Sequence, residues 1–346
     1  MSLGEIGVLL AASWIGTMLT LLPWGLATDR FGERRVIAIA LLGAALFLLA
    51  AAFASSFELL LILLGLVGAM GAAVNSASGR AVMHWFAADE RGLALGVRQT
   101  AIPLGGFVAA LTLPPIAEAG GTRAAFAYLA ALSAVGGLVG ALVLRGREAP
   151  DGIEPASVLD TIGDRKLWRL SLGSGLYIYS QVAVMGFGVL FLVDQHGFTE
   201  QAAALVFAAG LVLAMACRIG AGRWSDLIGA RVVPLRRVGL AIVAVMLLTA
   251  LLARGPSEIL VPVLILACGL TMAWNGLSFT AAAELAGPVR SGAALGVQQT
   301  VLAAAGVAAP VLFAASVARS SWAAAFGFSA LFPLAGWALL RALRER

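Results

Sequence analysis

Residues 94–100 read Ala-Leu-Gly-Val-Arg-Gln-Thr, and residues 294–300 repeat them as Ala-Leu-Gly-Val-Gln-Gln-Thr. The repeat extends upstream of these residues, since Asn75 and Asn275 are separated by the same offset of about 200 residues. Self-similarity over so long a period, in a chain this apolar, is typical of a membrane transporter built from two related halves.

The composition places the 346-residue chain in lipid. Apolar residues make up 61% of it and charged residues 12%, whereas a soluble domain carries about 25% charged residues. The mean hydropathy is +0.98. The 23 basic residues sit in short gaps between apolar stretches, so nucleic-acid binding is not expected. We find no metal-ligand cluster, phosphate loop or nucleophile–base set, and we therefore expect neither an enzyme nor a cofactor or metal.

Apolar stretches long enough to cross a bilayer predict an all-α integral membrane protein with eleven transmembrane helices. They fall near residues 6–27, 36–55, 58–84, 92–117, 124–144, 167–193, 200–221, 237–254, 258–283, 292–317 and 322–343. We expect a five-helix bundle in 1–144, a cytoplasmic linker at 145–166 and a six-helix bundle in 167–346.

The arginines predict the orientation. One set of alternate loops holds or closely adjoins fourteen basic residues, whereas the opposite set holds only Arg123, Arg254 and Arg319. Because positive charge favours the cytoplasmic side, we expect Met1 outside and Arg346 in the cytoplasm. Since Lys166 is the single lysine among the basic residues and alanine is abundant, we expect a bacterial protein of the inner membrane.

Two loops on the basic side carry one pattern. The run Gly25-x3-Asp29-Arg30-x-Gly32-x-Arg34 returns as Gly222-Arg223-x2-Asp226-x2-Gly229-x-Arg231. Both runs resemble the cytoplasmic signature of the major facilitator superfamily, from which only Glu33 departs. The resemblance implies two pseudo-symmetric bundles of six helices that rock around a central cavity. It also implies that the family's first helix is missing here, through a start assigned too late or a real truncation.

The chemistry of the signature residues suits a gate that opens and closes the cytoplasmic side. Its glycine permits close helix approach, and Asp29 can accept hydrogen bonds at a neighbouring helix N-terminus. Arg30 and Arg34 can pair with carboxylates on the facing half. The alternative is that these loops are only a basic topology signal. The predicted gating residues are Gly25, Asp29, Arg30, Gly32, Arg34, Gly222, Arg223, Asp226, Gly229 and Arg231.

Polar side chains along several spans should face a cavity or a partner helix, because polar groups facing hydrocarbon are costly. The resemblance implies that these helices line the substrate path, while interhelical hydrogen bonding is the alternative. The candidate substrate-binding residues are Asn75, Arg98, Gln99, Tyr177, Gln181, Arg218, Trp274, Asn275, Gln298 and Gln299.

Arg98 and Arg218 lie inside predicted spans. Their guanidinium groups either reach the headgroups or recognise a planar anion. Arg218-x3-Gly222 is similar to a run on the eighth helix of monocarboxylate and oxalate carriers, in which the arginine binds substrate. Ala214 stands where monocarboxylate carriers place an acid, which argues against proton coupling through this helix.

We therefore predict a secondary active or facilitative carrier of a small solute, an organic anion, working by alternating access. A proton or counter-anion could be coupled to it. The alternatives are an efflux carrier for drugs or lipophilic compounds, and a non-transporting sensor or truncated remnant.

Overall fold

The computed structural model describes residues 3–144, 158–287 and 289–343, and over these residues it is helical without strands. Contacts divide the chain into two compact units. Unit 1 comprises Met1–Trp85, Leu104–Asp164 and Ala286–Thr300, and unit 2 comprises Phe86–Pro103, Arg165–Leu285 and Val301–Arg346. Much of the predicted linker 145–166 lies outside the described residues, so the boundaries 1–144 and 167–346 remain a prediction.

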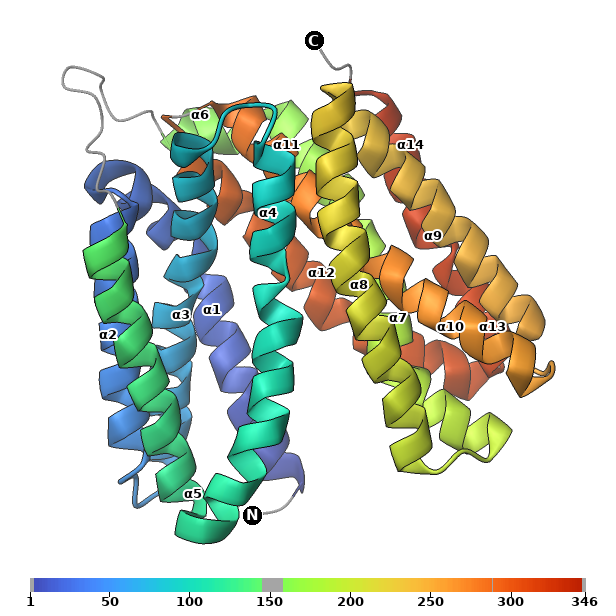
Figure 1. Ribbon diagram of the computed structural model, residues 1–346, viewed down its shortest axis with the longest axis horizontal. Coiled ribbons are helices and arrows are strands. Elements are labelled where there is room, and N and C mark those ends of the chain that lie inside the picture. The colour runs from blue at the N-terminus through green and yellow to red at the C-terminus, as the bar shows by residue number, and fades with distance from the viewer. Residues whose placement is uncertain (1–2, 145–157, 288, 344–346) are drawn as a thin grey trace. The chain divides into compact units, whose positions relative to one another are not determined.

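Unit 1 is built on three helices that lie side by side in Figure 1, α1 (Leu3–Phe31), α2 (Glu33–Ala51) and α3 (Phe57–Trp85). It also holds most of α5 (Ala101–Val143), the short α6 (Val158–Ile162) and the first turns of α12 (Ser291–Arg319). Thr20 Oγ1 and Trp24 Nε1 both donate to the carbonyl oxygen of Ala69, at 2.8 and 2.7 Å. These bonds fix the register of α1 against α3.

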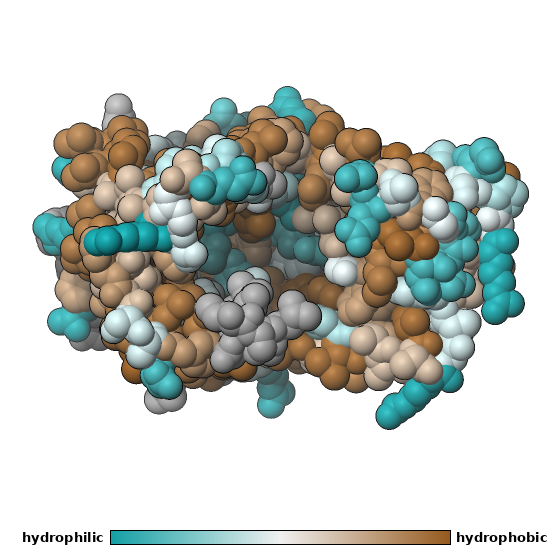
Figure 2. Space-filling model, turned by 90° about the horizontal axis from the view of Figure 1, so that it is seen from below, coloured by the Kyte–Doolittle hydropathy of each residue, from teal (hydrophilic) through white to brown (hydrophobic). Residues whose placement is uncertain are grey.

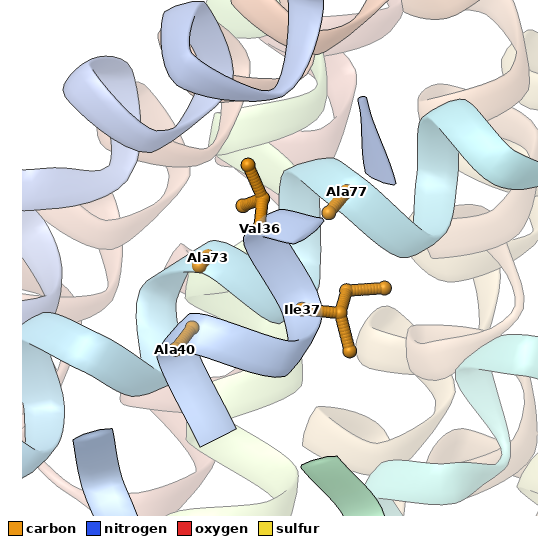
Figure 3. Close-up of a cluster of buried hydrophobic side chains, with 5 residues drawn as sticks. All are labelled: Val36, Ile37, Ala40, Ala73 and Ala77. Carbon is orange, nitrogen blue, oxygen red and sulfur yellow. The ribbon is translucent and has the colours of Figure 1, made fainter. Parts of the chain in front are cut away.

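Small side chains allow α2 and α3 to approach closely. Val36, Ile37 and Ala40 of α2 pack on Ala73 and Ala77 of α3, as Figure 3 shows. Within lipid there is no hydrophobic drive for helices to associate, so such close van der Waals packing contributes much of the attraction.

Unit 2 contains α4 (Arg91–Gln99), α7 (Arg165–His196), α8 (Glu200–Ile228) and α9 (Val232–Leu252). It continues with α10 (Ser257–Met272), α11 (Trp274–Ala286), the later part of α12, α13 (Trp322–Ser329) and α14 (Leu331–Arg341). Ser278 of α11 donates to Ser174 of α7 at 2.7 Å, and both side chains are buried. This bond satisfies two hydroxyl groups that would be costly in hydrocarbon.

The surface is that of a membrane protein. Large apolar side chains such as Leu142 (80% exposed) and Leu251 (81% exposed) stand outward, and hydrophobic side chains reach the face drawn in Figure 2 between scattered hydrophilic ones. Among the described residues, nine helical runs are long and apolar enough to cross a membrane. One of them, Arg91–Val143, spans 53 residues and is interrupted at Gly121. The count of eleven helices therefore stays a prediction.

Candidate functional site

In unit 1, Asp29 caps the N-terminus of α12. Its Oδ1 accepts the backbone N–H of Gly292 at 2.9 Å, and its Oδ2 accepts that of Ala293 at 2.7 Å. The first N–H groups of a helix have no partner within the helix, and the helix dipole favours an anion there. Gly32, with a φ of 78°, then turns the chain into α2.

In unit 2, Asp226 caps α4 in the same way. Its Oδ1 accepts the backbone N–H of Gly92 at 2.9 Å, and its Oδ2 accepts that of Leu93 at 2.7 Å. Gly229, in the left-handed region with a φ of 63°, ends α8. The two signature loops thus build one and the same backbone–carboxylate contact in the two units.

The first glycine of each signature lies where two helices nearly touch. A β-carbon on Gly25 would collide with the carbonyl oxygen of Gly292, and one on Gly222 would collide with that of Gly92. Any larger residue would push the capping carboxylate away from the helix N-terminus that it binds.

The ionic surroundings of Asp29 come from residues that the sequence pattern did not single out. Arg80 of α3 lies with its Nε 3.3 Å from Asp29 Oδ1 and donates from Nη1 to Glu33 Oε2 at 2.6 Å. Glu33 is fully buried, and its Oε1 lies 3.6 Å from Nδ1 of His84. Two carboxylates, one arginine and one histidine therefore meet inside unit 1.

Around Asp226 the charges are arranged differently. Arg231 donates to Asp226 Oδ1 and to both carboxylate oxygens of Glu284, the latter at 3.1 Å. Arg91 Nη1 lies 4.0 Å from Glu284 Oε1. Burial lowers the pKa of Arg231, but its hydrogen bonds to Glu284 and Asp226 outweigh burial and leave that pKa above its usual range.

The other arginines of the signatures lie outside these ion pairs. Arg34 Nε donates to the carbonyl oxygen of Ala141 at 2.6 Å, so that it ties α2 to α5 within unit 1. The guanidinium of Arg30 lies 5.4 Å from the centre of the Phe31 ring. Arg223 is exposed on α8.

Arg218 of α8 is the largest buried charged side chain of unit 2, with 2% of it exposed. Its Nη1 donates to the carbonyl oxygen of Gln99 at 2.5 Å, and its Nε donates to that of Met272 at 3.0 Å. The third contact joins Nη2 to Asn275 Oδ1 at 3.5 Å. No carboxylate among the described residues pairs with it.

Both carbonyl groups are available because a helix is interrupted beside them. Gln99 is the last residue of α4, and its carbonyl would normally accept the N–H of residue 103, but that residue is Pro103. Met272 is the last residue of α10, before the interruption at Ala273. Two helix C-termini, each carrying partial negative charge, therefore hold the Arg218 guanidinium.

Three more predicted site residues adjoin Arg218. Arg98 Nη1 donates to Gln99 Oε1 at 3.0 Å, so that Gln99 links the two arginines through its side chain and its backbone. Asn275 is half-buried beside Arg218. The structure thus brings together Arg98, Gln99, Arg218 and Asn275.

The aromatic candidates of unit 2 form a second group. The rings of Tyr177 and Trp274 meet edge to face at 6.0 Å, and both are fully buried. The Trp274 Nε1 and the Gln181 Oε1 are buried without a hydrogen-bond partner among the described residues. In unit 1, Gln298 is buried, whereas Asn75 and Gln299 are half-buried.

The sequence pattern missed Arg80 as a partner of Asp29, although Arg80 is a charge within the apolar stretch 58–84. The same signal had pointed to Arg98 and Arg218. The pairing of Glu284 with Arg231 carried no such signal, because Glu284 stands at the end of a helix.

The model of the Major Facilitator Superfamily matches residues 1–310. The chain belongs to the Major Facilitator Superfamily. It is 33% identical over 338 residues to the Mycobacterium tuberculosis protein called "Uncharacterized MFS-type transporter Rv2994", which covers 96% of this chain and 75% of that relative.

Solved superfamily structures share the fold. The Escherichia coli fucose:proton symporter FucP aligns with a TM-score of 0.78 at 17% identity, over 99% of this chain and 92% of its own. The human organic anion transporter MFSD10 aligns with a TM-score of 0.81 at 20% identity, over 96% and 83%. The predicted membrane fold and family are confirmed, and the superfamily chain is a multi-pass membrane transporter.

Proposed function

We propose that this superfamily member carries a small organic anion across the bacterial inner membrane by alternating access, and that Arg218 recognises the anion. One observation carries the proposal. Arg218 is a buried guanidinium that protein oxygens hold in place while no described carboxylate neutralises it. A buried charge is costly unless it is paired, so the site favours a ligand of opposite sign.

The arrangement leaves part of the guanidinium for such a ligand. Arginine has five N–H donors in a rigid fork, and Arg218 uses three of them on Gln99, Met272 and Asn275. The remaining donors suit a planar carboxylate, which accepts two parallel hydrogen bonds. The half-buried amide of Asn275 supplies a further polar group beside them.

The two carboxylate caps support a gating role for the signature loops. Each cap consists of two hydrogen bonds to one helix N-terminus, which can form and break as a unit. Because the arginine bias predicts that both loops are cytoplasmic, the caps would close that side of the carrier in one state and release it in the other. A proton or a counter-anion remains the proposed coupling partner.

Uptake of labelled monocarboxylates and dicarboxylates into liposomes that contain the purified chain tests the proposal. Arg218→Ala should lower kcat/KM about 100-fold, because paired charge-assisted hydrogen bonds contribute about 3 kcal/mol. Arg218→Lys, which keeps the charge without the fork, should fall between this variant and the wild type. Arg237→Ala removes an exposed arginine of unit 2 and should leave uptake unchanged.

The Arg218 variants also need a folding control, because the side chain holds two helix ends. Size exclusion and thermal unfolding in detergent should show a folded Arg218→Lys protein. Full anion uptake by a folded Arg218→Ala protein would contradict the proposal that Arg218 recognises the anion. Export of lipophilic cations without any carboxylate transport would instead favour the efflux alternative.

A further inference from the structure

Unit 1 contains a buried pair of polar atoms that face each other without a hydrogen bond. Glu33 is 0% exposed, and its Oε1 lies 3.6 Å from Nδ1 of His84, at the last turn of α3. Neither atom has a hydrogen-bond partner among the described residues. Leaving a buried carboxylate oxygen unpartnered is costly, and a proton on Nδ1 of His84, which the imidazolium and one neutral tautomer both carry, would supply the missing donor.

The charge balance of the cluster points to the same proton. Asp29 and Glu33 bring two negative charges, and Arg80 brings one positive charge that contacts both carboxylates. The four side chains are neutral overall when the cluster binds one proton, and His84 is the group that would place this proton beside the unpartnered oxygen of Glu33. Histidine can take up and release a proton near neutral pH, which arginine does not do.

The corresponding cluster of unit 2 needs no proton. Asp226 and Glu284 are matched there by Arg231 and Arg91, which keep their charge throughout the physiological range. By the 200-residue offset, Glu284 stands where unit 1 has His84. Unit 2 thus has two arginines for its two acids, whereas unit 1 has one arginine and one histidine for its two acids.

The charged groups around the pair come from four elements. Asp29 lies at the end of α1, Glu33 begins α2, and Arg80 and His84 belong to α3, while α12 contributes the N–H groups of its first turn. Four further arginines lie near these elements in sequence, Arg30, Arg34, Arg35 and Arg290, of which the first three are exposed and Arg290 is half-buried.

We propose that Glu33 and His84 form a proton-binding site that controls the Asp29 cap on α12. The proton comes from water at the loop end of unit 1, binds Nδ1 of His84 and donates to Oε1 of Glu33. The neutral cluster then remains buried, and Asp29 stays on Gly292 and Ala293. When the proton returns to water, the surplus negative charge favours the hydrated arrangement, in which the cap is open. The inference rests on the proposed gating role of the cap.

Spin labels on either side of the cap test this in the full chain. Cysteines at Phe31 and Val289, in a Cys217→Ala/Cys268→Ala background reconstituted in nanodiscs, report the separation of α1 from the start of α12. Between pH 5.5 and pH 8 the ratio of open to closed populations should rise about fivefold, a modest value for a linked equilibrium. His84→Gln should abolish this rise, and His84→Arg should keep the cap closed at both pH values.

Two controls separate the proton site from the gate. His196→Gln, which removes the histidine of unit 2, should leave the pH response unchanged. Asp29→Asn should open the cap at both pH values. A pH response that survives in His84→Gln would overturn the proton site alone, provided that Asp29→Asn opens the cap. No change of distance in Asp29→Asn would instead overturn the gate itself.

Discussion

The two units build the same contact and surround it with different charges. Asp29 and Asp226 each accept two backbone N–H groups at 2.9 and 2.7 Å. Asp29 has its arginine on the long helix α3 and its second acid at the start of α2, whereas around Asp226 the arginine directly precedes α9 and the second acid is on α11. The contact to the helix end is thus kept, while the positions of acid and base are exchanged.

A second pair of equivalent helix contacts, at Gly296 in unit 1 and Gly96 in unit 2, also keeps its backbone geometry while the side chains differ. A β-carbon on Gly296 would lie 2.8 Å from the carbonyl oxygen of Leu21, and one on Gly96 would lie 2.6 Å from that of Arg218. Equivalent backbones approach equally closely, yet one position carries leucine and the other a buried arginine. Packing has been preserved at these equivalent positions, while the polarity of the side chain at one of them differs between the units.

The strongest test of this difference is Arg80→Met. The substitution leaves Asp29 and Glu33 buried without their cation, so the free energy of unfolding should fall by about 4 kcal/mol. Equilibrium unfolding in mixed detergent micelles measures it. Arg231→Met in unit 2 should cost less, because Arg91 remains beside Glu284.

A double substitution provides the control for that prediction. Glu33→Met combined with Arg80→Met replaces both buried partners by apolar side chains and should recover most of the lost stability. If the double variant is as unstable as the sum of the two single variants, the ion pair does not account for the effect of Arg80.

A smaller and more symmetrical effect is expected at the caps. Asp29→Asn and Asp226→Asn each exchange a charged acceptor of two N–H groups for a neutral amide, and each should lower the free energy of unfolding by about 2 kcal/mol. Similar values for the two variants would show that the caps are energetically equivalent. If the two losses of unfolding free energy differ by more than about 2 kcal/mol, the surrounding charges contribute more to stability than the caps do.

The smallest effect concerns the helix interruption beside Arg218. Pro103→Ala provides an N–H that competes with Arg218 for the Gln99 carbonyl oxygen, and the KM for the anion should rise about threefold, equivalent to less than about 1 kcal/mol. Pro310→Ala in α12 is the matched control, because the described contacts place no arginine there. An equal rise in KM for both variants would attribute the effect to helix stiffness.

The sequence predicted most of the fold because its signals are local. Apolar stretches of membrane length, separated by short basic loops, predict the helices, and the repeated signature marks Asp29 and Asp226. The pattern also pointed to Arg218, Gln99 and Asn275 separately, through polar groups in apolar surroundings. It did not predict that hydrogen bonds join them, because this depends on the carbonyl groups that Pro103 and the interruption at Ala273 leave free.

By itself, the sequence determined that this chain lies in lipid and consists of two related halves, since hydrophobicity and the repeat are properties of neighbouring residues along the chain. Only the tertiary structure decided which charges meet. Asp29 binds the backbone N–H of Gly292, 263 residues away, and Glu33 contacts Arg80 and His84 on a different helix. A side chain's partner is set by which helices touch and at what register, and an exchange of acid and base between the halves leaves the repeat itself unchanged.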